Sequence, residues 1–320
     1  MVKKAFITGI AGSTGSFLAE YLLKQNLEVH GISRWHSTSA NNKNLKNATK
    51  DIRMFECDLN DLSAVVRTLK ESKPDYIFHL AAHANVKVCF SNPLAVMQNN
   101  VMGTMNLFEA VRLLELDPIV QHCSTSEVYG NVKREETPIK ETHPLNPANI
   151  YAVSKLAQEK IAQSYFYSYN MKTVITRMFA YLNPRREDIF SSAFAKQIVR
   201  IERGQQKEIV HGNLESVRTL IDIRDAVESY WVASNNCNYG EPYNIGGNTI
   251  MSVGDFLQKI KNCSIEKNIE SRCDESLLRP IDVTMQIPDI SKFFNKTMWE
   301  PKYTFEESME MLMEHYRGRP

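Results

Sequence analysis

A glycine-rich turn directly after the first apolar segment constrains the fold of this chain more than any other feature. Lys4–Thr8 has the composition of a buried strand, Thr14–Gln25 that of a helix, and Gly9, Gly12 and Gly15 mark the turn between them. Glycines at this spacing allow a tight turn and a close approach of a ligand to the backbone. Free N–H groups at the start of the helix attract phosphate. The turn therefore predicts an α/β fold that opens with a dinucleotide-binding loop, although an ordinary strand–helix turn is the alternative.

The first half of the chain alternates short apolar runs with amphipathic stretches, which is typical of repeated β-α-β units. Further strands are expected at Glu28–Ser33, Ile52–Glu56, Tyr76–Leu80, Ile119–Cys123 and Thr173–Arg177. Helices are expected at Leu62–Glu71, Ala95–Leu113 and Ile150–Tyr169. This alternation predicts an α/β fold with a doubly wound, Rossmann-type parallel sheet.

Beyond Arg177 the pattern becomes less regular, which indicates a second, smaller lobe. Helices are expected at Ser191–Glu202, Ile223–Ser234 and Phe305–Tyr316, with another that Ser252 caps and that ends near Lys261, and a short strand at Pro242–Ile245. We assign residues 1–177, with returning segments near 219–246, to the dinucleotide-binding domain. The remainder of 178–320 would form a discontinuous C-terminal lobe that binds the substrate.

Charge and composition exclude several classes of function. Of the 320 residues, 38 are basic and 37 acidic, so a net charge of +1 provides no general attraction for nucleic acid or membranes. The six cysteines lack the spacing of a zinc site, and no apolar stretch is long enough to span a bilayer. We therefore expect a cytoplasmic protein without a metal ion.

Tyr151-Ala-Val-Ser-Lys155 is the strongest candidate for catalytic chemistry. On a helix, positions i and i+4 share a face, so the phenol and the ammonium would project into one space. A free tyrosine has a pKa of about 10, and a nearby cation favours its phenolate. Such a pair taken alone is more often a solvated surface pair. Its significance comes from Thr125 and Glu127, which follow the expected fifth strand and could add a hydroxyl and a carboxylate to the same site.

The end of the second expected strand distinguishes between two dinucleotides. An acidic residue there would bind the ribose hydroxyls of NAD, but this chain has Ser33-Arg34, which favours the 2′-phosphate of NADP. NAD remains possible, because Arg34 could be a surface residue. The other residues expected at the cofactor are the loop Gly9, Gly12, Ser13, Thr14 and Gly15, then Asp58 and Leu59 at the adenine, Leu80, Ala81 and Ala82 at the nicotinamide, and Tyr151 with Lys155.

With these pieces in order, the chain resembles the extended short-chain dehydrogenase/reductase superfamily over essentially its whole length. The motifs that carry the resemblance are Gly9-x-x-Gly12-x-x-Gly15, Asp58-Leu59, His79-Leu80-Ala81-Ala82, Ser124-Thr-Ser-Glu-Val-Tyr-Gly130, Tyr151-x-x-x-Lys155 and Arg279-Pro280. The resemblance implies a Rossmann-fold enzyme that modifies a nucleotide-diphosphate sugar and works as a homodimer or a tetramer.

Within this superfamily the chain is most similar to the branch of GDP-mannose 4,6-dehydratase and GDP-4-keto-6-deoxymannose reductase. Asn183-Pro-Arg-Arg186 resembles the dehydratases, whereas Phe194-Ala-Lys-Gln-Ile198 resembles the reductases. One departure concerns a Phe-Asn-His run whose asparagine contacts the substrate diphosphate in the family. Here the run is Phe179-Ala180-Tyr181.

The resemblance implies a role for each candidate residue in a 4,6-dehydratase. Tyr151 would take the proton of the C-4 hydroxyl, Lys155 would lower its pKa, and Glu127 would take the C-5 proton and assist loss of the C-6 hydroxyl. Thr125 would hold the C-4 oxygen. The residues expected to bind the GDP-linked substrate are Ser126, Arg185, Asn213, Arg218 and Arg279. The alternatives are a C-4 reductase, dehydrogenase or epimerase on a similar substrate, and a cofactor-sensing regulator without catalysis.

Overall fold

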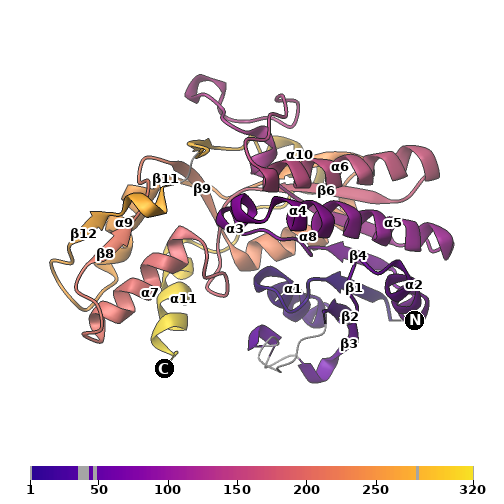
Figure 1. Ribbon diagram of the computed structural model, residues 1–320, viewed down its shortest axis with the longest axis horizontal. Helices are drawn as coiled ribbons and strands as arrows, with labels where there is room; N and C mark the ends of the chain where they lie inside the picture. Colours follow the sequence, from indigo (N-terminus) through magenta and orange to yellow (C-terminus); the bar gives the residue numbers. More distant parts are fainter. Residues whose placement is uncertain (1, 35–42, 46–48, 279–280, 320) are drawn as a thin grey trace.

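A twisted sheet of seven parallel strands forms the centre of the molecule (Figure 1). The computed structural model describes residues 2–34, 43–45, 49–278 and 281–319. The strand order β10-β6-β5-β4-β1-β2-β3 confirms the expected Rossmann-type fold. The strands are β1 (Lys4–Thr8), β2 (Glu28–Ser33), β3 (Ile52–Glu56), β4 (Tyr76–His79), β5 (Ile119–Thr125), β6 (Thr173–Met178) and β10 (Pro242–Ile245).

Helices cover both faces of this sheet. On one face, α1 (Ser13–Lys24) and α8 (Ile223–Asn236) enclose a core to which Leu18 and Tyr230 belong. On the other face, α2 (Leu62–Ser72), α5 (Gly103–Leu113) and α6 (Ile150–Tyr169) enclose a second core. A parallel sheet must be buried on both faces, which explains why its strands are near-continuous apolar runs.

The expected single helix over Ala95–Leu113 is wrong in one respect. The segment starts earlier, with α3 (Val86–Ser91) and α4 (Pro93–Met97), and a π-helical turn, η3 (Gln98–Met102), separates α4 from α5. The buried Asn100 lies in this turn; its side chain accepts from the His83 amide and donates to the Ser154 hydroxyl of α6. A π turn inserts one residue into the helix, and apolar spacing alone does not reveal it.

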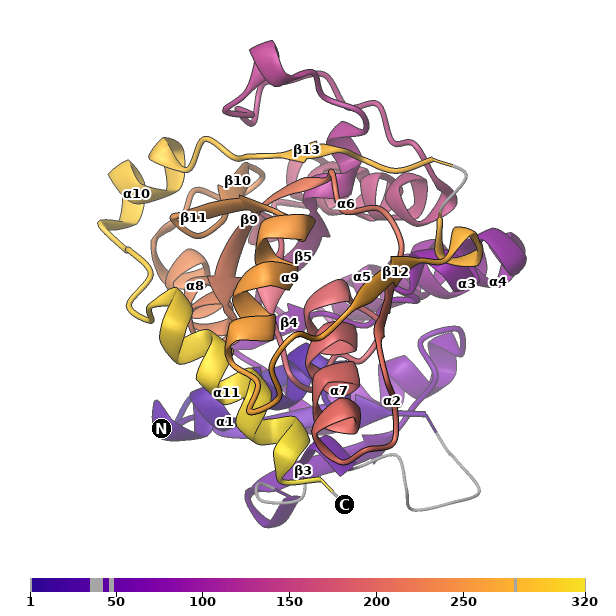
Figure 2. The same cartoon turned by 90° about the vertical axis from the view of Figure 1, so that its left-hand side faces the viewer.

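Short strands and three longer helices build the smaller lobe, which faces the viewer in Figure 2. β9 (Val217–Asp222) pairs with β11 (Thr249–Ser252), β13 (Met285–Gln286) and β7 (Tyr181–Leu182), and β8 (Ile209–His211) pairs with β12 (Ser271–Cys273). These strands were not predicted, because two to six residues are too few for a clear alternation. The helices are α7 (Phe190–Glu202), α9 (Val253–Asn262) and α11 (Phe305–Arg317), with the shorter α10 (Ser291–Thr297) beside β10.

The chain crosses between the two parts more than once. After β9 it returns through α8, and β10 then pairs with β6 at the edge of the large sheet. The boundary after residue 177 stays a prediction. Residues 130–149 form a loop, part of which projects from the molecule in both views (Figures 1 and 2), while Ile139 in this loop forms backbone hydrogen bonds with Ile287 and Asp289. Among the described residues, no helix has the length and apolar character needed to cross a bilayer.

Candidate active site

The glycine turn between β1 and α1 has the geometry of a phosphate-binding loop. Gly9 has φ +73°, and a Cβ atom there would lie 3.0 Å from the Ala81 Cα atom. The Gly12 amide donates to the Gly9 carbonyl at 2.9 Å, which closes the turn. The N-cap of α1 is Gly12, which has no side chain to cap the helix, and its first turn has no acidic residue, so its first N–H groups suit an anion.

A cavity of about 400 Å³ extends from this turn along the carboxyl ends of β1, β2 and β4. Every residue expected at the cofactor lines it: Gly9, Gly12, Ser13, Thr14, Gly15, Ser33, Arg34, Asp58, Leu59, Leu80, Ala81, Ala82, Tyr151 and Lys155. The crevice at the carboxyl ends of the strands is where ligands bind in open α/β sheets. The cavity therefore brings the predicted cofactor residues together, and their individual roles remain predictions.

Arg34 lies where this cavity opens into a second hollow, which Asp58 and Arg67 also line. β2 ends at Ser33, whose hydroxyl donates to the Arg34 carbonyl at 3.3 Å. The end of β2 thus carries a cation and a hydroxyl and no acidic residue of its own. Glu56, Asp58 and Asp61 also line the hollow next to Arg34.

Tyr151 and Lys155 lie on the first turns of α6. The N-cap of this helix is Asn149, whose side chain accepts from the Ala152 amide at 2.9 Å. Burial raises the pKa of Tyr151 above its ordinary value, while the positive charge of Arg186 and a hydrogen bond with Thr125 oppose that rise. Burial also lowers the pKa of Lys155 to about 8, with the negative charge of Glu159 among the opposing influences. The lysine therefore loses its proton far more readily than a solvated one.

A second cavity, of about 210 Å³, joins the first at Tyr151. Thr125, Ser126 and Glu127 line it, because β5 runs two residues further than expected and continues directly into the 3₁₀ turn η4 (Ser126–Tyr129). The Glu127 amide donates to the Thr125 hydroxyl at 3.3 Å. A carboxylate and a phenol thus face one space from two different elements.

Asn149 is a site residue that the sequence did not identify. Its carboxamide oxygen caps α6, and its nitrogen donates to the Glu127 carboxylate at 3.0 Å. One side chain therefore ties the start of the Tyr151 helix to Glu127. An asparagine two residues before the tyrosine is an N-cap signal, but sequence alone does not show what its second polar atom binds.

The structure places the remaining candidates for substrate binding differently. Arg218 lines the second cavity, where its guanidinium lies 3.8 Å from the Asp282 carboxylate. Asn213 also contacts Asp282, at 2.8 Å, but does not line this cavity. Arg185 points instead to α1, where it pairs with Glu20 at 2.7 Å and lies over the Phe17 ring. Arg279 lies outside the described residues.

Arg186 lines both cavities, as the sequence analysis did not foresee. Its guanidinium donates to the Tyr181 hydroxyl and to the Ala84 carbonyl, both at 3.2 Å, and pairs with Asp188 at 3.1 Å. The Tyr181 hydroxyl also lies 2.9 Å from that of Thr14 in the phosphate loop. Of two adjacent arginines, the backbone of the loop directs the second one inward. Ala180 lies beside Tyr181 in the wall of the second cavity.

Comparison with known proteins identifies the family. A family model described as GDP-mannose 4,6 dehydratase matches residues 6–312. A GDP-mannose 4,6-dehydratase of Vibrio cholerae is 31% identical over an alignment that covers 98% of this chain and 94% of the relative. The chain belongs to the GDP-mannose 4,6-dehydratase family. This family is one of the two that the sequence motifs had indicated.

Solved structures agree with the fold expected of the GDP-mannose 4,6-dehydratase family. UDP-glucose 4-epimerase of Thermus thermophilus, in complex with NAD, has a TM-score of 0.86 at 27% identity and covers 98% of this chain and 99% of its own. RMD from Pseudomonas aeruginosa, in complex with NADPH, also has a TM-score of 0.86, at 22% identity, with 100% of both chains covered. The same fold thus carries either dinucleotide.

Proposed function

We propose that this protein is a nucleotide-sugar 4,6-dehydratase that acts with NADP on GDP-mannose or a related GDP-sugar. The observation that carries the proposal is the meeting of Glu127 and Tyr151 in one cavity next to the cavity of the phosphate loop. A C-4 reductase or epimerase removes no C-5 proton, so it does not need a carboxylate as a base at that place. Elimination of water across C-5 and C-6 does need one.

The residues present fit a dinucleotide. The uncapped start of α1 and the glycine turn suit its pyrophosphate, and Arg34 with Ser33 suits the 2′-phosphate of NADP. Tyr181 and Arg186 lie between the loop and the second cavity. When bound, NADP would accept a hydride from C-4 of the sugar and return it at C-6.

The side chains of this chain supply the proton transfers. Tyr151, as phenolate, takes the proton of the C-4 hydroxyl, and the Thr125 hydroxyl holds the same oxygen. The C-4 ketone that results acidifies the proton on C-5. Glu127 takes that proton and donates it to the C-6 hydroxyl, which leaves as water. Once C-6 has received its hydride, the Tyr151 phenol gives its proton to C-5, which restores the phenolate. Asn149 orients the Glu127 carboxylate for both transfers.

Arginine suits the diphosphate of the substrate, because its guanidinium matches phosphate geometry. Arg218 and Ser126 line the second cavity and are the first candidates. Asn213 would act indirectly, because its side chain binds Asp282, the carboxylate beside Arg218. The ion pair of Arg185 with Glu20 favours a role in supporting α1. At Ala180 the diphosphate lacks the amide of its relatives, and we assign the lost contact to Arg186, which shares that wall.

We further propose that the protein is a cytoplasmic homodimer. Leu113 of α5 and Tyr169 of α6 are 54% and 53% exposed, although both are large and apolar, so a partner on these helices would cover them. Among the described residues all cysteines are free thiols, which suits a reducing compartment.

One experiment tests the proposed reaction directly. Purified protein receives GDP-mannose with NADP⁺, and in parallel with NAD⁺, each in catalytic amount, and the products are analysed by mass spectrometry. We expect the loss of one water from the sugar nucleotide, no net reduction of the cofactor, and faster turnover with NADP⁺. Accumulation of NADPH, or an isomer of unchanged mass, would identify a C-4 dehydrogenase or an epimerase instead.

A further inference from the structure

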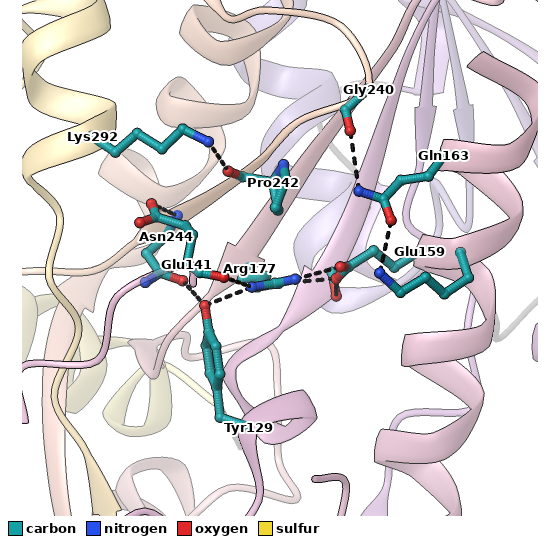
Figure 3. Close-up of polar contacts among 11 residues, drawn as sticks. Tyr129, Glu141, Glu159, Gln163, Arg177, Gly240, Pro242, Asn244 and Lys292 are labelled. Atoms are coloured by element: carbon teal, nitrogen blue, oxygen red, sulfur yellow. Dashed lines mark hydrogen bonds and ion pairs between the residues drawn. The ribbon is translucent and has the colours of Figure 1, made fainter. Parts of the chain in front are cut away.

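A buried ion pair lies behind the active site, between α6 and β6. The guanidinium of Arg177 donates to both carboxylate oxygens of Glu159, from Nε at 3.1 Å and from Nη2 at 2.5 Å (Figure 3). The side chains of Arg177 and Glu159 are 3% and 0% exposed. Such a pair costs much desolvation and is weak evidence for stability by itself, so its position suggests another role.

The remaining polar atoms of the pair reach the segments that carry the candidate catalytic groups. The Ser124 hydroxyl, directly before Thr125, donates to Glu159 at 3.1 Å. The third nitrogen of Arg177 donates to the Tyr129 hydroxyl at 2.9 Å, two residues after Glu127, and to the Glu141 carbonyl at 2.9 Å. Figure 3 shows the guanidinium between Tyr129 and Glu159. One ion pair thus joins α6, the end of β5 and η4.

This network continues to β10, the edge strand that pairs with β6. The Tyr129 hydroxyl donates to the side-chain oxygen of Asn244 at 2.7 Å. The backbone N–H of Asn244 donates to the Glu141 carboxylate at 2.8 Å (Figure 3). Arg177 is therefore held in one position by groups from several elements. A guanidinium fixed in this way can act as a rigid reference for the segments that it contacts.

The pair also bears on the charge of Lys155. Glu159 follows Lys155 by one helical turn, on the same face of α6, and its carboxylate is among the influences that raise the pKa of that lysine. With Arg177 in place, two guanidinium nitrogens and the Ser124 hydroxyl occupy the carboxylate oxygens. Lys155 therefore remains directed to the cofactor cavity, which it lines.

We propose that Arg177 and Glu159 are positioning residues, which hold the Tyr151–Lys155 helix against the Thr125–Glu127 segment and keep the Glu159 carboxylate from binding Lys155. This inference rests on the proposed function, because only that function makes the four residues Tyr151, Lys155, Thr125 and Glu127 catalytic. It assigns no contact with substrate or cofactor to the pair.

The pKa of Lys155 tests the proposal, and it can be measured without following the reaction. Lysine labelled with ¹³C at Cε is titrated by NMR in the full-length protein, and Lys155→Met identifies the resonance. Arg177→Met leaves the carboxylate unpaired, so we expect the pKa of Lys155 to rise by about one unit. Glu159→Gln keeps hydrogen-bonding capacity but removes the charge, so we expect a fall. In the double variant the two shifts should largely cancel.

A conservative variant of Arg177 distinguishes its effect on the position of the catalytic segments from the effect of its charge. Arg177→Lys keeps the positive charge but cannot reach Glu159, Tyr129 and Glu141 together. We expect it to leave the pKa of Lys155 near the wild-type value and to lower kcat at least tenfold with little change in KM. Arg272→Met removes an exposed ion pair with Glu208 and should change none of these quantities.

Two results would overturn the proposal. Titration of Lys155 at its wild-type pKa in both Arg177→Met and Glu159→Gln, with only the melting temperature lowered, would show a merely structural pair. So would full kcat in Arg177→Lys. If Arg177→Met does not fold, the fall in the pKa of Lys155 expected in Glu159→Gln and its reversal in the double variant still test the proposal. The pKa of Lys155 can be measured even if the protein does not dehydrate GDP-mannose. The positioning role of the pair and the proposed function can therefore be contradicted independently.

Discussion

At the residue scale, the proposed chemistry depends on two side chains with different surroundings. Glu127 is held by Asn149 at the edge of the second cavity, whereas Tyr151 lies at the junction of both cavities. We expect Glu127→Gln to lower kcat for dehydration about 10²- to 10⁴-fold, because the amide cannot take the C-5 proton. Cofactor binding, measured by fluorescence of bound NADPH, should stay unchanged. Glu135→Gln, at an exposed glutamate of the adjacent loop, is the matched control, and an equal loss there would contradict the assignment.

The pKa of Lys155 determines where the pH profile of kcat/KM should change slope. In the proposed mechanism the active form has Tyr151 without its proton and Lys155 with its proton, but burial raises the pKa of Tyr151 and lowers that of Lys155 to about 8. Below pH of about 8, kcat/KM should rise about tenfold per pH unit, because the deprotonated fraction of Tyr151 rises while Lys155 stays charged. Above it, loss of the lysine proton offsets this gain and the profile becomes flat. In Lys155→Arg the rise should continue past this point, since arginine keeps its proton. A plateau at the same pH in that variant would exclude Lys155 as its origin.

At the scale of elements, Asn149 couples a helix to a catalytic group. Asn149→Ala removes both the N-cap of α6 and the contact with Glu127, so we expect a loss of about 1 kcal/mol in the free energy of unfolding and a lower kcat. Asn149→Ser retains a capping oxygen but has no amide for Glu127. It should therefore unfold at nearly the wild-type urea concentration and still lose turnover. Wild-type kcat in the serine variant would show that Asn149 acts only as a cap.

The same elements show what sequence could and could not predict. The bounds of α6 were predicted as observed, and an asparagine marks each end: Asn149 is the N-cap, and Asn170, with a left-handed backbone, is the C-cap. The end of β5 was placed two residues early, since Ser124 and Thr125 are polar yet buried, with the Ser124 hydroxyl bonded to Glu159 and that of Thr125 to the Glu127 amide. Arg185 was predicted to bind the substrate, whereas Arg186 lines the cavities. Two adjacent arginines in a loop cannot be distinguished by sequence until the backbone is known. The Arg177–Glu159 pair joins residues eighteen apart on different elements, and no local pattern reveals it.

At the scale of the whole molecule, the exposed apolar residues of α5 and α6 form the interface of the proposed homodimer. We expect light scattering to give about twice the 36.7 kDa of one chain. Leu113→Glu places a charge on the proposed interface and should reduce this mass to that of a monomer. Ile265→Glu changes an exposed apolar residue of the smaller lobe, which is 70% exposed, and should leave the dimer intact. A monomeric wild type at micromolar concentration would contradict the proposed interface.

The two cavities meet at Tyr151, and this arrangement makes the fate of the C-4 hydrogen the most direct test of the account. GDP-mannose with deuterium at C-4 is converted with catalytic NADP⁺, and the product is examined by NMR. If the protein is a 4,6-dehydratase, the deuterium appears at C-6 of a 4-keto-6-deoxy sugar, because the hydrogen that leaves C-4 returns within the same active site. Deuterium that remains in released NADPH, or that returns to C-4 of the opposite configuration, would contradict the account.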